Sequence, residues 1–191
     1  AQKNTHKISI DNIIQHTLSV KLGVKKSLLV VDMPKGSYSN PNTALKNARL
    51  ILKKTSCDAV KLENYKNNFK IINYLVKRKI PVMGHIGFTP QFKKKFKIEG
   101  QSNKETQNLL KEAKSIENAG AFAIVLECLT SNAAKKITNQ IKIPTIGIGS
   151  SSYCDGQVLV TDDMLGISGF YPKFVKKYQN LDRIIEKAVK E

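Results

Sequence analysis

The sequence predicts an α/β fold built on a parallel sheet. Apolar runs of strand length alternate with amphipathic stretches along the 191 residues, at a spacing of about 25–30 residues that is typical of βα units. Several apolar runs end in a charged residue, as expected for an active site at the carboxyl ends of parallel strands. Six runs suit strands, whereas a (β/α)8 TIM barrel needs eight. The residues alone therefore leave two architectures open, an open sheet or a barrel that lacks its first two βα units.

Local signals place the helices and strands in order. The chain opens on a helical pattern at 8–22, in which apolar residues share one face. Asn40 and Pro41 are typical of the N-cap and first position of the next helix, which reaches about Lys54. Gly120 suits the position just after a helix. Further helices are expected over 66–78, 103–119, 131–140 and 180–190, and strands over 27–33, 58–63, 80–86, 121–128, 143–149 and 157–161.

Composition predicts one globular domain, residues 1–191. Hydrophobic residues make up 41% of the chain, enough for a packed core. No apolar run approaches the ~20 residues that span a bilayer, and the polar segment 1–7 is unlike a signal peptide. The three cysteines are widely spaced and odd in number, which indicates a reducing compartment. We therefore expect a cytoplasmic protein.

The charge balance is strongly basic, with a formal net charge of +17. Nucleic-acid binding is one interpretation of such a charge. The arginines are only Arg49, Arg78 and Arg183, however, and lysine lacks the bidentate geometry with which arginine reads bases. A lysine-rich surface that attracts small anionic substrates is the simpler interpretation, so we expect no nucleic-acid partner.

Lys61 and Glu63 are two residues apart on an expected strand, so their side chains should lie on one face. On a solvated face they would be ordinary surface residues. Strands of parallel sheets are normally buried on both faces, however, and a buried charge needs a partner or a chemical role. The pair therefore indicates a functional site.

Asp32 follows four apolar residues at the end of another expected strand. Such an aspartate is often only a turn former or a helix cap. Together with Glu63 on a neighbouring strand end, it would supply two hard oxygen ligands. This pair suits Mg²⁺.

His85 and Glu127 end two further expected strands. Gly84 and Gly87 flank the histidine and leave room for another group to approach, although a single histidine is more often structural. Burial at the end of an apolar strand would raise the pKa of the Glu127 carboxyl, which suits a general base or acid. An ion pair between Glu127 and a nearby lysine is the alternative.

Gly147 and Gly149 end the strand expected over 143–149. A cradle for a phosphate or carboxylate is one interpretation, and close approach of a substrate is another. The full dinucleotide-binding fingerprint is absent.

Beyond single residues, the chain carries a series of motifs in a fixed order. Each motif alone is weak, but so many in one order, from about Thr5 to Tyr178, are highly specific. They are Val31-Asp32-Met33-Pro34, Gly36-Ser37-Tyr38, Val60-Lys61-Leu62-Glu63, Pro81-Val82-Met83-Gly84-His85-Ile86-Gly87, Thr89-Pro90-Gln91, Leu126-Glu127-Cys128, Ile143-Pro144-Thr145-Ile146-Gly147-Ile148-Gly149, Asp155-Gly156-Gln157 and Pro172-Lys173-Phe174. In this order they resemble the ketopantoate hydroxymethyltransferase family.

The resemblance implies a (β/α)8 barrel and a role in pantothenate biosynthesis, on the route to coenzyme A. The enzyme would transfer a hydroxymethyl group from 5,10-methylenetetrahydrofolate to 3-methyl-2-oxobutanoate, giving 2-dehydropantoate through a Mg²⁺-stabilised enolate. By motif position, Asp32 and Glu63 would bind the metal. Asp32, Lys61 and His85 would contact the keto acid, and Glu127 would accept the proton. The family also implies a large, decamer-like homo-oligomer.

Two departures from the family pattern stand out. The family's opening strands, with a Gly-Asp-Ser stretch that supplies a metal ligand and a substrate serine, have no counterpart in residues 1–27. We therefore expect an N-terminally incomplete barrel sequence. The family also usually has two glycines where this chain has Asn64 and Tyr65. Two other functions stay open: a Mg²⁺-dependent keto-acid carbon–carbon lyase or mutase on a related barrel, and a non-catalytic basic protein that binds nucleic acid.

Overall fold

A computed structural model describes residues 8–65, 68–93, 95–169 and 171–191. The helices are α1 Ile10–Gly23, α2 Pro41–Thr55, α3 Phe69–Val76, α4 Asn103–Asn118, α5 Ser131–Thr138, α6 Thr161–Leu165 and α7 Leu181–Lys190. The strands are β1 Val30–Asp32, β2 Ala59–Glu63, β3 Val82–Gly87, β4 Ala123–Glu127, β5 Thr145–Ile148 and β6 Gly156–Gln157.

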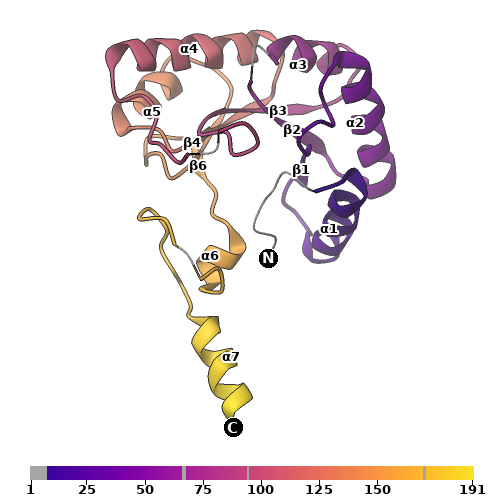
Figure 1. Ribbon diagram of the computed structural model, residues 1–191. Coiled ribbons are helices and arrows are strands. Elements are labelled where there is room, and N and C mark those ends of the chain that lie inside the picture. Colours follow the sequence, from indigo (N-terminus) through magenta and orange to yellow (C-terminus); the bar gives the residue numbers. More distant parts are fainter. Residues whose placement is uncertain (1–7, 66–67, 94, 170) are drawn as a thin grey trace.

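The six strands form one parallel sheet in the order β1-β2-β3-β4-β5-β6, so each strand lies beside its successor in sequence. Helices α2 to α5 form an arc around one face of the sheet, and α1 continues the arc beside α2 (Figure 1). The sheet is curled, like half of a barrel. The prediction of an α/β fold with six parallel strands is therefore confirmed. Within the described residues the sheet does not close, since β1 and β6 are its edges.

The local signals for helix ends are confirmed. The Asn40 side chain caps α2 by accepting a hydrogen bond from the Thr43 amide at 2.9 Å, and Pro41 is the first helical residue. Gly120 follows the end of α4 with φ = 93°, a left-handed conformation that glycine adopts without strain. Thr130 caps α5.

One segment differs from its prediction. The strand expected over 157–161 ends at Gln157, and Thr161 begins α6 instead. Asp162 and Asp163 lie in the first turn of this helix, where acidic side chains interact favourably with the helix dipole. The helix expected over 66–78 also begins later, at Phe69, and residues 66–67 lie outside the described part of the chain.

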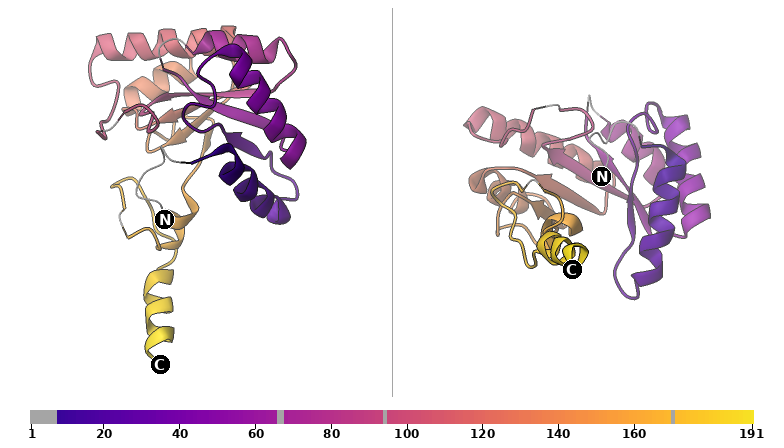
Figure 2. Two further views of the ribbon diagram at one scale, coloured as in Figure 1. Left: turned by 45° about the vertical axis from the view of Figure 1, so that its right-hand side comes forward. Right: turned by 60° about the horizontal axis from the view of Figure 1, so that its bottom comes forward.

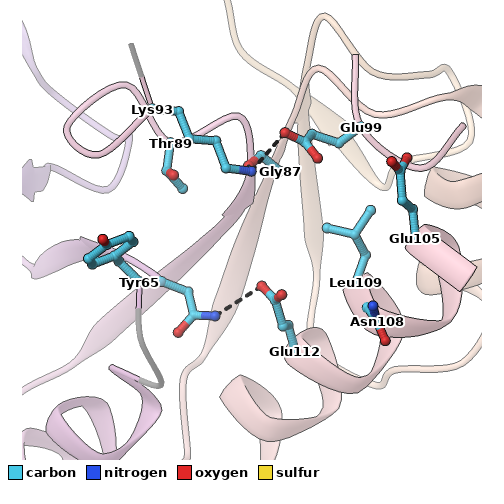
Figure 3. A pocket seen from close by; sticks show the side chains of 10 residues that line it. Tyr65, Gly87, Thr89, Lys93, Glu99, Glu105, Asn108, Leu109 and Glu112 are labelled. Carbon is cyan, nitrogen blue, oxygen red and sulfur yellow. Dashed lines mark hydrogen bonds and ion pairs between the residues drawn. The ribbon is translucent and has the colours of Figure 1, made fainter. Parts of the chain in front are cut away.

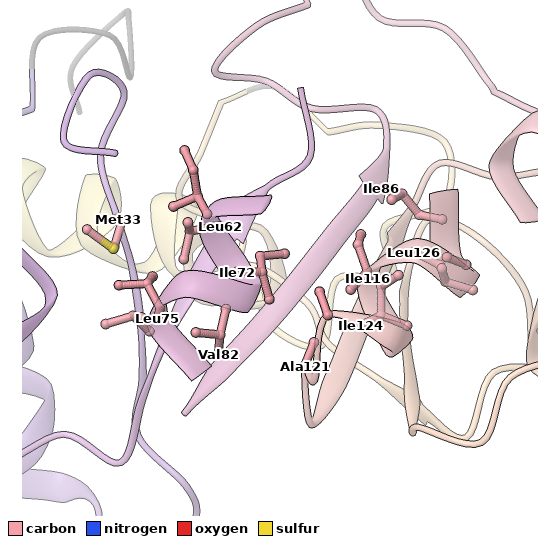
Figure 4. Packing of buried hydrophobic residues seen from close by; sticks show 14 of the residues in the cluster. Met33, Leu62, Ile72, Leu75, Val82, Ile86, Ile116, Ala121, Ile124 and Leu126 are labelled. Carbon is pink, nitrogen blue, oxygen red and sulfur yellow. The ribbon is translucent and has the colours of Figure 1, made fainter. Parts of the chain in front are cut away.

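The hydrophobic core lies between the sheet and the arc of helices. Leu62 of β2, Ile86 of β3, and Ile124 and Leu126 of β4 all have no exposed surface, and they belong to one buried cluster with Ile116 of α4 (Figure 4). These residues alternate along their strands with the charged residues predicted to form the site. The alternation of side chains therefore directs apolar groups to the helices and charged groups to the opposite, concave face.

Helix α7 extends away from the sheet (Figures 1 and 2). Its apolar residues Ile184, Ile185 and Val189 are 58%, 55% and 80% exposed. Among the described residues, none of the helices has the length and apolar character that crossing a membrane requires.

Candidate active site

The strands bring the five predicted site residues to the same end of the sheet, where the carboxyl ends of the strands lie. Asp32, Glu63 and Glu127 are the last residues of β1, β2 and β4. In the strand register, Asp32 lies opposite Lys61, and Glu63 lies opposite His85. α/β enzymes place their catalytic groups at this end of the sheet.

A continuous series of polar contacts links four of these residues. The Lys61 Nζ atom lies 2.9 Å from Asp32 Oδ1 and 3.2 Å from His85 Nδ1. On the other side of the ring, His85 Nε2 lies 3.2 Å from Glu127 Oε2 and 3.1 Å from the Phe88 carbonyl oxygen. Since the Lys61 ammonium can only donate, Nδ1 accepts and Nε2 carries the ring proton. This assigns the tautomer of His85 from its partners.

His85 is a neutral member of this series. The ring is 2% exposed. Burial lowers the pKa of His85 to about 3, and the nearby Lys61 charge lowers it further. The Nε2–H group donates to the Phe88 carbonyl oxygen, and the 3.2 Å contact with Glu127 is a close polar contact with a neutral imidazole and not an ion pair. Among the described residues no lysine forms an ion pair with Glu127, and His85 lies between Glu127 and Lys61.

The Glu127 carboxyl has the raised pKa that its strand predicts. Burial raises the pKa of Glu127 to about 7, while the positive charge of Lys61 opposes the rise. Its neighbours on the strand confirm the expected alternation, because Ile124 and Leu126 join the core against the helices and Val125 does not. A carboxylate with a pKa near neutrality can both accept and return a proton.

Glu63 is the most deeply buried of the carboxylates, at 1% exposed. Its oxygens accept hydrogen bonds from the Gln91 backbone amide at 3.0 and 3.4 Å. Burial raises the pKa of Glu63 to about 8; Lys61 opposes this shift, and the charge of Asp32 adds to it. The chain therefore holds a desolvated carboxylate beside a second acidic group, an arrangement that a cation would stabilise.

Asp32 and Glu63 fit a magnesium site in which the protein supplies only part of the ligands. Both line a small cavity of about 110 Å³, together with Pro34 and Gln91. Among the described residues, the buried Asp32 Oδ1 atom accepts no hydrogen bond, although Lys61 Nζ lies 2.9 Å away as an ion-pair partner. Among the described residues, no three acidic, histidine or cysteine side chains gather as metal ligands. Mg²⁺ is often held by one or two carboxylates, with water and substrate completing its shell. Two carboxylates are therefore a sufficient protein contribution.

A second, larger cavity of about 340 Å³ opens beside the site (Figure 3). Of the residues that line it, Asn64 directly follows Glu63 of β2, and Gly87 lies two residues after His85 of β3. The Lys93 ammonium donates to Glu99 Oε1 at 2.7 Å, and the Asn64 amide Nδ2 donates to Glu112 Oε2 at 3.0 Å. Lys93, Glu99 and Glu112 lie around this cavity (Figure 3). The remaining lining residues are Tyr65, Thr89, Glu105, Asn108 and Leu109. Asn64 and Tyr65, which replace the family's two glycines, thus form part of the wall.

Three glycines of the motifs, Gly84, Gly147 and Gly149, lie where a side chain would meet packed neighbours. A Cβ atom on Gly84 would lie 2.4 Å from Ile116 Cγ2, so the absence of a side chain lets α4 approach β3. Likewise, a Cβ on Gly147 would meet Gln157 at 2.9 Å, and one on Gly149 would meet the Phe174 ring at 2.6 Å. Side chains of Gln157 and Phe174 therefore occupy the space beside these two glycines, and the cradle for a phosphate or carboxylate stays a prediction.

Comparison with known proteins identifies the family. The family model described as ketopantoate hydroxymethyltransferase matches residues 1–191. The chain belongs to this family. It is 51% identical over 185 residues to 3-methyl-2-oxobutanoate hydroxymethyltransferase of Pelagibacter ubique, covering 97% of this chain and 72% of that protein. A second relative, from Zymomonas mobilis, is 49% identical and is covered over 68% of its length. The prediction of a hydroxymethyltransferase enzyme is confirmed.

Solved structures support the fold. A putative phosphonomutase from Burkholderia cenocepacia aligns with a TM-score of 0.58 at 11% identity, over 74% of this chain and 61% of that one. Phosphonopyruvate hydrolase aligns with a TM-score of 0.57 at 12% identity, over 97% of this chain and 66% of that one. At such low identity these two structures inform the architecture and not the chemistry.

Sequence reasoning missed two residues that contact the site. Tyr38 and Gln91 are 3% and 6% exposed, and the Tyr38 hydroxyl donates to Gln91 Oε1 at 2.7 Å. Each lies in a motif that carries the family resemblance, but neither motif suggested a role. Their separation of 53 residues hides the contact in the sequence.

Proposed function

We propose that this protein transfers a hydroxymethyl group from 5,10-methylenetetrahydrofolate to 3-methyl-2-oxobutanoate and forms 2-dehydropantoate. Membership of the family supports the reaction. The observation that carries the proposal for this chain is the series of contacts from Asp32 through Lys61 and His85 to Glu127. It supports the proposal because the Glu127 carboxylate and the Lys61 ammonium lie on one concave surface.

In this proposal Glu127 removes the proton from C3 of the keto acid. The C3 carbon then forms a bond to the methylene carbon of the donor as one of the two bonds from that carbon to the donor nitrogens breaks. A hydroxyl group from water replaces the second carbon–nitrogen bond. The proton that Glu127 took from C3 and the proton released from water go to the two donor nitrogens. His85 lies against Glu127, with Nε2 3.2 Å from Oε2, and its neutral ring adds no charge that would weaken the base.

Lys61 and the two carboxylates make the proton removable. A carboxylate is too weak a base for an ordinary ketone, so the site must lower the pKa of the C3–H group by several units, each of about 1.4 kcal/mol. The Lys61 ammonium would bind the keto-acid oxygens beside Asp32. Asp32 and Glu63 would hold Mg²⁺, which when bound supplies further positive charge toward those oxygens.

The folate donor would enter from the larger cavity. That cavity adjoins the site through Asn64 and Gly87, and its volume of about 340 Å³ accommodates a bicyclic ring. The basic charge of the chain, +17 overall, would attract both the keto acid and the anionic tail of a folate.

Three broader properties complete the proposal. The curled sheet would be part of a (β/α)8 barrel, because its strands follow one another in barrel order. The protein would act in the cytoplasm, where its three buried cysteines stay reduced. It would assemble with copies of itself, since the apolar face of α7 is exposed.

Proton exchange at C3 tests the proposal. We expect the protein to exchange the C3 proton of 3-methyl-2-oxobutanoate for deuterium in D₂O when Mg²⁺ is present, as followed by NMR without folate. The Glu127→Gln variant keeps the size of the side chain but cannot accept the proton, so its exchange should fall by at least ~100-fold. Exchange at the wild-type rate in this variant would show that Glu127 is not the base.

The folate requirement separates this function from its alternative. Adding 5,10-methylenetetrahydrofolate should yield 2-dehydropantoate. A keto-acid lyase or mutase on the same fold would turn over its substrate without folate. Conversion of the keto acid to any product in the absence of the donor would therefore contradict the transferase.

A further inference from the structure

We propose that Tyr38 and Gln91 are positioning residues that set the separation of the two candidate metal ligands, Asp32 and Glu63. This inference rests on the proposed function, because it concerns the magnesium site described there. It gives a role to the Gly36-Ser37-Tyr38 and Thr89-Pro90-Gln91 motifs, which the reaction itself does not use.

Gln91 bonds to both strands that carry the carboxylates. Its backbone amide donates to Glu63 at the end of β2, at 3.0 Å to Oε2. Its side-chain Nε2 donates to the carbonyl oxygen of Met33 at 2.9 Å, and Met33 directly follows Asp32 at the end of β1. One residue thus fixes the end of each strand relative to the other.

Tyr38 fixes the orientation of the Gln91 amide. The phenol donates to Gln91 Oε1 at 2.7 Å, in a buried contact. If the amide were rotated by half a turn, Oε1 would face the Met33 carbonyl, and two acceptors would meet. The hydroxyl therefore holds the amide so that Nε2 points at Met33. The Tyr38 ring is itself packed edge-on against Phe92, with ring centres 6.3 Å apart.

The arrangement matters because Glu63 has few other partners. Its carboxylate is 1% exposed, and the hydrogen bonds it is seen to accept come from the Gln91 backbone. A metal ion binds tightly only when both carboxylates already lie at the right separation. Groups that hold metal ligands in place typically affect metal affinity about 10–100-fold.

The experiment measures metal binding directly. Mn²⁺, used in place of Mg²⁺, is titrated into the protein and its free concentration is followed by electron paramagnetic resonance. Tyr38→Phe removes only the hydroxyl, and Gln91→Met removes both side-chain hydrogen bonds but keeps the backbone amide that holds Glu63. We expect the dissociation constant of Mn²⁺ to rise about tenfold in Tyr38→Phe and about 10–100-fold in Gln91→Met.

Tyr74→Phe is the matched control. The Tyr74 hydroxyl also donates to a side-chain amide oxygen at 2.7 Å, that of Asn42, but this contact joins α3 to α2 on the outer surface. Its loss should leave Mn²⁺ affinity unchanged. Circular dichroism verifies that each variant is folded. If Gln91→Met does not fold, the smaller change Tyr38→Phe still tests the proposal.

The outcomes separate the two proposals. Wild-type affinity for Mn²⁺ in both Tyr38→Phe and Gln91→Met would overturn the positioning role and leave the transferase intact. Weaker binding in Tyr74→Phe to the same degree would also overturn it, because the effect would then be general. A wild-type protein that binds no Mn²⁺, yet still exchanges the C3 proton, would overturn the metal site itself.

Discussion

At the scale of single residues, the site depends on one neutral side chain between two charged ones. Lys61 is positive and Glu127 is the candidate base, and the two would form a direct ion pair if they touched. Such a pair would lower the pKa of the carboxyl and weaken it as a base. The buried imidazole of His85 separates them, with Nδ1 toward Lys61 and Nε2 toward Glu127. The separation preserves a carboxylate whose pKa lies at about 7.

The raised pKa of Glu127 predicts a pH dependence. A base must be ionised, so the rate of C3 proton exchange should rise with pH, reach half its maximum near pH 7 and level off above it. The same shift has the opposite sign for stability. Between its ordinary pKa of 4.5 and about 7, the folded protein binds more protons than the unfolded chain, so its stability should decrease as the pH rises through this range. NMR exchange rates from pH 5.5 to 8.5 check the first part.

His85→Ala provides the comparison for this pH profile. The variant removes the ring that buries Glu127 and separates it from Lys61, so the carboxyl becomes more hydrated and more exposed to the lysine charge, and the midpoint should move to lower pH. A midpoint that does not move, or a rate that falls with pH, would contradict the assignment of Glu127 as the base.

Part of this residue-scale arrangement was predictable from sequence. The spacing of Lys61 and Glu63 predicted that they share a face, and the apolar strand before Glu127 predicted the direction of its pKa shift. The partner of Glu127 was not predictable, because it depends on which strands are neighbours and on their register. The structure gives that register: His85 lies opposite Val125, two residues before Glu127.

At the scale of elements, the contact between β3 and α4 depends on a missing side chain. Gly84 lies on the strand opposite Ile116, whose side chain is fully buried. Since His85 is the next residue, this contact also fixes the strand that carries the central residue of the site. Gly84 has no positive φ, so its role is steric and not conformational.

Gly84→Ala should therefore destabilise the protein. The new Cβ would lie 2.4 Å from Ile116 Cγ2, and a β-branched residue in a packed core cannot easily turn away. We expect the free energy of unfolding to fall by about 1–3 kcal/mol, as is typical of overpacked cores. Urea denaturation measures the change.

Gly23→Ala is the control for this substitution. Gly23 is the last residue of α1, and a Cβ there would meet nothing within 4 Å. That variant should be neutral or more stable by up to about 1 kcal/mol. If Gly84→Ala were as stable as wild type, the close approach of α4 would not be the reason for a glycine at this position.

Most elements were predictable because their ends carry local chemistry. Asn40 with Pro41, Thr130 and Gly120 each mark a helix end through a hydrogen bond or a backbone angle within a few residues. Helix α6 was missed because the three apolar residues that precede it, 158–160, also have the pattern of a strand. Whether such a run pairs with β5 is decided by its neighbours in space, and the pairing ends at Gln157.

At the scale of the whole molecule, charge and shape act together. The net charge is +17, yet the cavity beside the site is lined by three glutamates and one lysine. Composition predicted the basic surface, but it could not predict that acidic residues from α4 and the preceding loop meet in one hollow. The part of the fold that depends on long-range packing was thus the least predictable, including the direction in which α7 leaves the sheet.

Helix α7 predicts the effect of one substitution on assembly. A helix of ten residues is only marginally stable alone in water, and Leu181, Ile184, Ile185 and Val189 form an apolar stripe along one side of it. If copies of the protein bury this stripe against one another, Ile184→Glu should place a charge in the contact and reduce the oligomer to a smaller species. Arg183→Glu introduces the same side chain on the polar side of α7 and should leave assembly unchanged. Sedimentation velocity measures both variants, and an unchanged mass for Ile184→Glu would show that α7 does not hold the oligomer together.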